Sequence, residues 1–476
     1  MDGQPEPLLF VIAYTFTQLL YLLSMGIDLY FFSLPTNWVD MSEAKDLKEG
    51  DYPFIILFYP VLKEMESTMR TTFQSLEKVE YPRDRFKVIS IPNANDLETI
   101  QSLENLQKEF SFLEILQVPS ISDESWNLVW DAWEKNPKAY WWHVGKYAKR
   151  KDLPPKKTRQ LIYAFYHVAK QFEGKEDFLV NYIDADSCIP TDHFLAGAVG
   201  IRHYDVLQAT NIAGNLNATW AASFHAFDHL QWDIRKYPHL SANGKHPFWV
   251  LGKALFYKGS DLLFVGSFHP WIAIEDPEVG MRLWMNGKKL GIINKPVIEE
   301  VPCTFHRGIV QRKRWVCGFF QTLTEPLTRL GMTPYQKFLS WLNFIPCLSL
   351  WVNSIGLPIG IWQLILWLEG RGGLPLWIIV LSIFNISLYF LLLISLYISV
   401  WKNTALVLNS WTARLWYIIR INPLFSLFWG LFWLIPIWIG YRMYAGEGGL
   451  VWDRTQKVDA NAKLFKNNFL SWFKRK

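Results

Sequence analysis

The stretch Phe178-Leu179-Val180-Asn181-Tyr182-Ile183-Asp184-Ala185-Asp186 is an apolar run that ends in two carboxylates. The apolar residues predict a strand, and Asp184 and Asp186 would then lie at the carboxyl edge of a sheet, where open α/β sheets bind ligands. Two carboxylates at this spacing can share one divalent cation, which would neutralise a diphosphate. The pair alone is weak evidence, because most such pairs lie in solvated loops.

The segments before this strand predict the rest of the sheet. Phe54–Phe58 and Phe86–Ile91 have the composition of strands, and a helix from about Glu64 to Lys78 separates them. Strand, helix and strand at this spacing begin a parallel sheet. We therefore expect an α/β domain with a mixed, mainly parallel sheet over residues 50–334.

Two polar clusters follow the strand that carries the aspartates. The acidic pair Glu275-Asp276 can take a proton from an incoming hydroxyl. The run Gln311-Arg312-Lys313-Arg314-Trp315 offers cations for a leaving diphosphate and a flat face for a sugar ring, although a lone basic run is usually an exposed helix face. Their order, just before a long apolar tail, predicts a sugar-nucleotide site at a membrane face.

Composition excludes several classes. Half of the 476 residues are hydrophobic and 25 are tryptophan, which is too apolar for an ordinary soluble enzyme. The net charge of +5 is spread along the chain without a basic, aromatic patch, so we expect no nucleic-acid partner. The cysteines lack the paired spacing of a zinc site or a disulfide framework; they are Cys188, Cys303, Cys317 and Cys347.

The N-terminal region predicts a membrane anchor. Leu8–Ile27 is an uncharged run long enough to cross a bilayer, and it lacks the basic leader and cleavage site of a signal peptide. Residues 1–35 are therefore expected to form a transmembrane helix. Lys45 and Lys48 follow it, and the bias of basic residues toward the cytoplasm predicts a cytosolic globular domain in the plasma or inner membrane.

Further crossings are expected in residues 335–445. Phe338–Leu368 is too long for one span and is interrupted near Pro358, which predicts a hairpin of two helices. Pro375–Val400 and Leu424–Tyr441 would each cross once. Four crossings return the chain to the cytosol, in agreement with the basic tail of residues 446–476.

One loop disagrees with this multi-pass prediction. Residues 401–422 carry Lys402, Arg414 and Arg420, yet four crossings put this loop on the outer side. A single crossing by Phe338–Leu368 would move the loop inside but would put the tail outside.

In this order, the landmarks resemble the membrane-anchored, processive family 2 glycosyltransferases of the cellulose synthase and hyaluronan synthase kind. The likeness extends from about Phe54 to the tail and includes a QxxRW motif. Its landmarks are Pro60–Glu64, Tyr81–Phe86, Asp184 with Asp186, Asp205–Gln208, Pro270–Asp276, Gln311–Trp315 and a Trp452–Thr455 element similar to the Trp-x-Lys-Thr of bacterial members.

The resemblance implies an inverting transferase with a GT-A fold, interfacial helices near residues 305–330 and a nucleoside-diphosphate sugar donor. Asp184 and Asp186 would contact the donor and bind Mg²⁺ or Mn²⁺, Asp276 would be the general base, and Glu275 would orient it. Further donor-binding residues would be Pro60, Glu64, Asn93 and Lys157, and the diphosphate or acceptor would contact Gln311, Arg312, Arg314, Trp315 and Gly252.

Two residues depart from the usual pattern of the family, and they leave the identity of the donor open. Asn93 stands where members of the family usually carry an acidic residue that grips the base, and Ile162 stands where Asn is common. A Trp-rich tract from Trp126 to Trp142 either packs on the sheet or on lipid headgroups, or binds the acceptor.

The acceptor is a glycan or a lipid. The Gln311–Trp315 motif favours a growing polysaccharide, whereas the Trp-rich tract suits a glycolipid product. A glycoside hydrolase would need neither a metal pair nor a basic run. A non-catalytic membrane scaffold is the other alternative.

Overall fold

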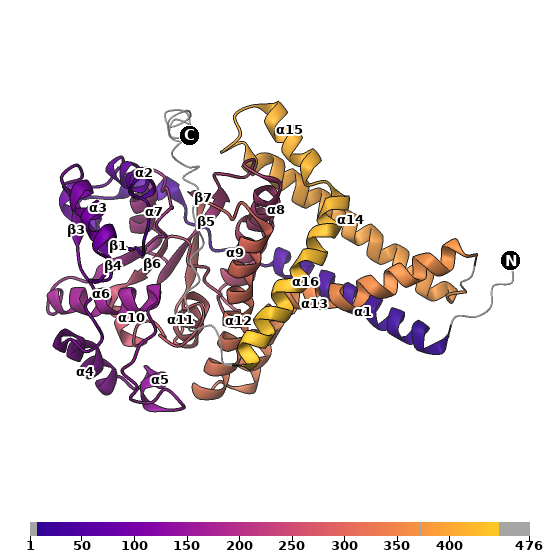
Figure 1. Cartoon of the computed structure of the whole chain (residues 1–476), viewed down its shortest axis with the longest axis horizontal. Coiled ribbons are helices and arrows are strands. Elements are labelled where there is room, and N and C mark those ends of the chain that lie inside the picture. The colour runs from indigo at the N-terminus through magenta and orange to yellow at the C-terminus, as the bar shows by residue number, and fades with distance from the viewer. Residues whose placement is uncertain (1–6, 371–372, 447–476) are drawn as a thin grey trace.

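The computed structural model describes residues 7–370 and 373–446. The Trp452–Thr455 element and almost all of the basic tail lie outside the described residues. Figure 1 shows a head built around the sheet, with a bundle of long helices projecting from one side of it. The chain enters the head from the N-terminal helix of this bundle and returns to the bundle after the last strand.

The sheet has seven strands in the order β3-β2-β1-β4-β6-β5-β7. Neighbouring strands are parallel except at β6, which runs antiparallel to β4 and to β5. This confirms the predicted mixed, mainly parallel sheet. The strands are β1 (Phe54–Pro60), β2 (Phe86–Ile91), β3 (Leu113–Ile115), β4 (Phe178–Tyr182), β5 (Val206–Ala213), β6 (Leu255–Lys258) and β7 (Leu290–Glu299).

Helices cover both faces of the sheet (Figure 1). Those of the head are η1 (Met41–Asp46), η2 (Glu49–Asp51), α2 (Glu66–Glu77), η3 (Arg83–Arg85), α3 (Leu97–Gln107), η4 (Glu124–Trp126), α4 (Asn127–Lys135), α5 (Tyr140–His143), α6 (Lys157–Gln171), α7 (His193–Gly200), α8 (Trp220–His229), η5 (Leu230–Lys236), α9 (Tyr237–Ser241), α10 (Gly259–Phe264), α11 (Asp276–Met285) and α12 (Phe305–Arg329). The long C-terminal helices are α13 (Pro334–Leu368), α14 (Leu376–Thr404) and α16 (Pro423–Ala445), and α15 (Trp411–Arg420) is short.

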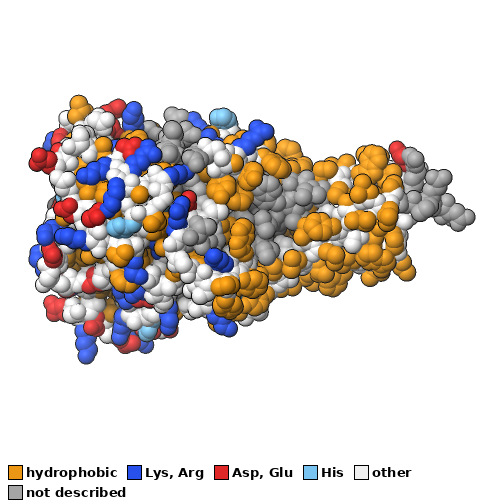
Figure 2. Space-filling model, turned by 90° about the horizontal axis from the view of Figure 1, so that it is seen from below, with side chains coloured by type: hydrophobic (Ala, Val, Ile, Leu, Met, Phe, Trp, Pro, Cys, Tyr) orange, Lys and Arg blue, Asp and Glu red, His pale blue; other side chains and the backbone are white. Residues whose placement is uncertain are grey.

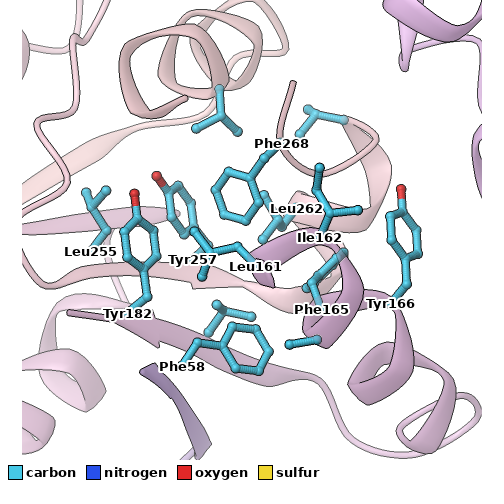
Figure 3. Packing of buried hydrophobic residues seen from close by; sticks show 14 of the residues in the cluster. Phe58, Leu161, Ile162, Phe165, Tyr166, Tyr182, Leu255, Tyr257, Leu262 and Phe268 are labelled. Atoms are coloured by element: carbon cyan, nitrogen blue, oxygen red, sulfur yellow. The ribbon is translucent and has the colours of Figure 1, made fainter. Parts of the chain in front are cut away.

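The central strand β4 is buried on both of its faces. All five of its residues are buried, since helices pack on both sides of the central strands. Figure 3 shows one of these layers, in which Leu161 of α6 lies beside Tyr257, and Tyr182, Ile162 and Phe165 belong to the same buried cluster. This packing holds the end of β4, and with it Asp184 and Asp186, in a fixed position.

The Trp-rich tract packs inside the head. Its five tryptophans belong to the same buried cluster as α6, and the rings of Trp130 and Trp142 stack at 5.5 Å between centroids. Their side chains are at most 5% exposed, so they are not available to lipid headgroups or to an acceptor. The interpretation that the tract packs on the domain is therefore the correct one.

The projecting bundle consists of α1 (Leu8–Ser33), α13 and α14. Of the residues that the structure describes, α1 and α14 form the two helices long and apolar enough to cross a membrane by length and composition. In Figure 2 the surface of this bundle is mainly hydrophobic, whereas charged side chains gather on the head.

The predicted hairpin of Phe338–Leu368 is wrong, because α13 is one continuous helix. Gly356 allows close packing in this helix and does not mark a turn. A Cβ atom there would lie 2.7 Å from Thr17 Cγ2 and 2.9 Å from Tyr21 Oη, both on α1. Small residues commonly occur where two membrane helices approach closely.

The loop between α14 and α16 lies against the head. On α15, Tyr417 Oη donates to the backbone oxygen of Ser223 at 3.0 Å, and Arg420 Nη1 donates to Ser223 Oγ at 2.9 Å. Ser223 belongs to α8, so this loop packs on the head. The last helix, α16, packs along α12, where a Cβ on Gly440 would meet Val316.

Candidate active site

A cavity of about 310 Å³ opens between the carboxyl edge of the sheet, α12 and α16. It brings together segments that are far apart in the sequence, from the end of β1 to the last described helix. Of the residues expected at the site, the following line it: Pro60, Glu64, Lys157, Asp184, Asp186, Gly252, Glu275, Asp276, Gln311, Arg314 and Trp315.

Asp184 and Asp186 follow β4 and take different positions. The side chain of Asp184 is 41% exposed and accepts a hydrogen bond from Lys157 Nζ at 2.6 Å. Asp186 is buried, and its Oδ2 accepts from the backbone N–H of Glu300 at 2.8 Å. Asp186 is therefore held by the sheet, whereas Asp184 faces the open part of the cavity.

This pair fits a hard divalent cation only in part. Within residues 7–370 and 373–446, no group of three or more His, Cys, Asp or Glu side chains is arranged to hold a metal ion. Two carboxylates supply oxygen ligands of the kind that Mg²⁺ and Mn²⁺ prefer, and Mg²⁺ is commonly completed by substrate phosphates and water. Asp184 and Asp186 can thus hold a cation that arrives with a diphosphate.

The acidic pair stands at the start of α11. Glu275 Oε2 accepts a hydrogen bond from Thr158 Oγ1 at 3.0 Å, which ties the pair to the first turn of α6. Asp276 Oδ1 is buried and finds no hydrogen-bond partner within the described part of the chain. Burial raises the pKa of Asp276 to about 6, while the nearby charge of Lys157 pulls it down. A carboxylate that is poised in this way can accept a proton near neutral pH.

Gly252 lies directly against this carboxylate. Its φ of +66° is in the left-handed region, and a Cβ there would lie 3.1 Å from Asp276 Cγ and would collide with Oδ2. Glycine is therefore required on two grounds, the backbone angle and the space taken by Asp276. The sequence predicted that Gly252 contacts the diphosphate or the acceptor, and in the structure the side chain that lies against it is Asp276 of α11.

Two lysines at the start of α6, Lys156 and Lys157, line the cavity. Burial lowers the pKa of Lys157, but the charges of Asp184, Glu275 and Asp276 more than offset this, so its pKa is raised. Lys156, which the sequence did not single out, donates from Nζ to the backbone oxygen of Ile272 at 3.0 Å. Burial lowers the pKa of Lys156 to about 8, against the opposing charge of Glu275.

The basic run on α12 divides between two faces of the helix. Gln311, Arg314 and Trp315 line the cavity, because residues three and four apart share one face. Arg312 does not line it, which corrects its expected contact with diphosphate or acceptor. Its buried guanidinium donates to Asp228 Oδ2 from Nε at 3.0 Å and from Nη2 at 2.5 Å.

Asn93 also lies outside the lining of the cavity. Its Oδ1 accepts a hydrogen bond from Arg159 Nη2 at 2.9 Å, so the amide is held by the first turn of α6. A contact with the base of a donor remains a prediction.

A model of glycosyl transferase family group 2 matches residues 179–444, more than half of the chain. The chain belongs to this family. No curated protein matches it by sequence. The family assignment rests on a segment that begins in β4 and ends in α16, so it includes Asp184, the acidic pair and the run on α12.

A solved structure of a mannosyltransferase has a related fold. The mannosyltransferase PcManGT from Pyrobaculum calidifontis, in complex with GDP-Man and Mn²⁺, is 15% identical, with a TM-score of 0.51 over 90% of this chain and 98% of that one. Residues 1–349 of S. aureus TarS are 13% identical, with a TM-score of 0.37 over 62% of this chain and 72% of that one. At 15% identity, the likeness to the mannosyltransferase shows only that this family 2 transferase has a GT-A-like fold.

Several residues of the cavity were not expected from the sequence. They come from α8 and η5 and from α16, which reach the site only in the folded chain; among them are Asp228, His229, Trp232, Asp233, Trp433 and Ile437. Trp429 Nε1 and Trp433 Nε1 of α16 donate to Asp228 at 2.5 and 3.1 Å, and this fastens α16 to the transferase domain. The one signal in the sequence was the spacing of His229 and Asp233, four apart.

Proposed function

We propose that this transferase moves a sugar, with inversion, from a nucleoside-diphosphate donor to a lipid acceptor at the membrane. The observation that carries this proposal is the single cavity in which Asp184, Asp276 and Trp315 meet beside α16. The donor end has carboxylates and cations, and the opposite wall is apolar. That wall consists of Val316, Phe319 and Phe320 of α12 and Ile437 of α16.

In this proposal the donor lies over the carboxyl edge of the sheet. Pro60 at the end of β1 and Glu64 beyond it border its nucleotide, and Asp184 faces its diphosphate. A divalent cation bound by Asp184 and Asp186 supplies positive charge to the diphosphate. Lys157 and Arg314 add fixed positive charge beside the leaving group, where it stabilises the developing anion.

Asp276 would act on the acceptor hydroxyl. Its Oδ1 takes the proton while the hydroxyl oxygen forms a bond to the anomeric carbon and the bond from that carbon to the diphosphate breaks. One displacement of this kind inverts the anomeric configuration. Glu275 is bonded to Thr158 and Gly252 gives Asp276 room, so both hold the base in place.

The bundle favours a lipid acceptor over a chain exported through the helices. In the described part of the bundle, Asn385 Nδ2 of α14 donates to the backbone oxygen of Gln18 on α1 at 2.9 Å, and Tyr14 Oη lies 3.2 Å from Ser382 Oγ. With Gly356 of α13 also against α1, the three helices contact one another directly. A growing polysaccharide is the second candidate, favoured by the Gln311–Trp315 motif on the cavity wall.

We also propose a multi-pass arrangement with three crossings, by α1, α13 and α14, and a cytosolic head. In this arrangement α16 lies along α12 at the membrane face and does not cross. The basic loop of α15 and the tail are then both cytosolic, which resolves the conflict in the sequence.

Transfer assays on the purified chain in lipid nanodiscs test the proposed function. A panel of labelled uridine, guanosine and other nucleotide sugars is supplied with a mixed lipid extract, and the products are separated by solvent extraction and by size. The proposal predicts a labelled product of lipid size with release of nucleoside diphosphate. Label in a high-molecular-weight product would favour the polysaccharide, and absence of transfer from every donor would contradict both candidates.

A further inference from the structure

A further part of the cavity wall comes from α8 and η5. His229 ends α8, and Trp232 and Asp233 follow in η5, which is a π-helix. A π-helical turn is rare, and it frequently occurs at functional sites because it changes the direction in which side chains project. In this protein, three side chains in or next to the π-helix line the cavity. Neither donor binding nor removal of the acceptor proton gives these three side chains a role.

His229 is oriented by a buried partner. Its Nδ1 lies 2.6 Å from Asp233 Oδ2, and both side chains are less than a tenth exposed. With Nδ1–H donating to the carboxylate oxygen of Asp233, Nε2 is the ring nitrogen that can accept a hydrogen bond from a ligand. No further hydrogen bond of this ring occurs within the residues that the structure describes, and the ring lines the cavity.

The basic side chains near this wall already have acidic partners. Arg312 is paired with Asp228, while Asp233 accepts a hydrogen bond from His229. Lys253, which lies near Asp233, donates to Glu299 Oε2 at 2.5 Å. Among the described residues of α8 and η5 that line the cavity, none is a cation that could bind an anionic group.

One aromatic ring lies next to the imidazole, and a second lines the same cavity. The ring of Trp315 on α12 lies 6.2 Å from that of His229, at 85° between planes, and Trp232 is the second cavity-lining ring. Indole rings provide a large apolar surface with little conformational entropy to lose. A nitrogen that can accept a hydrogen bond, together with such surfaces, suits a ligand that has an apolar ring face and hydroxyl groups at its edge.

We propose that His229, oriented by Asp233, accepts a hydrogen bond from a hydroxyl of a neutral sugar headgroup on the acceptor, with Trp232 and Trp315 beside the sugar ring. This rests on the proposed function, and it specifies the acceptor as a glycolipid in preference to a lipid phosphate. His229 is then a specificity-determining residue, and Asp233 is a positioning residue that acts through it.

Binding of three matched probes tests this assignment. Hexyl β-glucoside and hexyl β-mannoside carry neutral sugars, and hexyl phosphate has the same tail with an anionic head. Their dissociation constants are measured by saturation-transfer difference NMR on the full chain in nanodiscs. We expect a glycoside to bind more tightly than hexyl phosphate and His229→Phe to weaken its binding on the order of 10-fold, the usual effect of one lost buried hydrogen bond.

Two variants exclude a merely structural effect. His229→Gln keeps a hydrogen-bonding group near the position of Nε2 and should retain most of the glycoside affinity. His203→Phe removes an exposed imidazole that pairs with Glu43 at 2.8 Å, far from the cavity, and should leave binding unchanged. Affinity for UDP and GDP should be the same in all of these proteins.

Tighter binding of hexyl phosphate, or unchanged glycoside affinity in His229→Phe, would overturn the assignment. Equal losses of glycoside and nucleotide affinity in both His229 variants would also overturn it, since they indicate a disturbed fold. Because the assay measures binding, it separates the two proposals. Loss of glycoside binding in His229→Phe supports this subsite even where no sugar transfer is detected, in which case only the proposed function fails.

Discussion

Replacing Gly252 by alanine should slow transfer without weakening donor binding. The added Cβ would collide with Asp276 Oδ2 and lie 3.1 Å from its Cγ. Carbon atoms are normally about 3.5–4.0 Å apart at contact, so the carboxyl must move by about half to one ångström. A catalytic group misplaced by about 1 Å can lose on the order of 100-fold in rate, so we expect kcat to fall by roughly this factor.

The backbone contributes separately to the effect of this substitution. A non-glycine residue at φ +66° costs on the order of 1–3 kcal/mol. Gly244 is the matched control, because its φ is +74° and an added Cβ there would meet nothing within 4 Å. Gly244→Ala should lower the melting temperature about as much as Gly252→Ala but should leave kcat unchanged.

The assay measures the initial rate of nucleotide release at saturating donor and acceptor, with donor affinity measured by calorimetry. The reasoning predicts a low kcat and a normal dissociation constant for the donor in Gly252→Ala. Equal kcat values for Gly252→Ala, Gly244→Ala and the wild type would refute it. Lost donor affinity in Gly252→Ala alone would place Gly252 at the donor and not behind the base.

Three further predictions follow from the same contacts. Asp186→Asn should abolish transfer with little loss of folded protein, as should EDTA on the wild type; full activity in EDTA would exclude the cation. Transfer should fall as the pH drops through about 6, where Asp276 is protonated. Burial raises the pKa of Asp276 in the folded state above its ordinary value of 3.8, so ionisation of Asp276 destabilises the fold. Asp276→Asn should therefore raise the melting temperature at pH 8, where Asp276 is ionised, but not below about pH 4. Arg312→Leu leaves Asp228 buried without its cation and should destabilise the chain by about 3–5 kcal/mol, whereas Lys313→Ala should not; similar melting temperatures for the two variants would contradict the buried pair.

Local patterns predicted the sheet and much of the cavity. The apolar run before Asp184 forms β4 as expected, and the helical spacing of Gln311, Arg314 and Trp315 places them on one face. Both features depend on residues that are close in the chain. The GT-A-like arrangement follows from the order of such segments, and the family comparison confirms that order from β4 onward.

Other features depend on partners that are distant in the sequence. Arg312 is indistinguishable from its basic neighbours until α8 brings Asp228 to it. Gly356 and Pro358 resemble a turn, but the contact with α1 makes a continuous helix favourable. His229 enters the site only through the packing of α8 and η5 against α12, which no local pattern encodes.

The most direct test of the central claim, that this cavity performs glycosyl transfer with Asp276 as the base, compares Asp276→Asn with the wild type. Donor binding is measured by calorimetry, and acceptor-dependent transfer is measured on the same preparation in nanodiscs. The account predicts donor affinity within about 2-fold of the wild type and transfer reduced on the order of 100-fold or more, the range of general-base catalysis. Normal transfer by Asp276→Asn would contradict it, and loss of donor binding would move Asp276 from the base to the donor site.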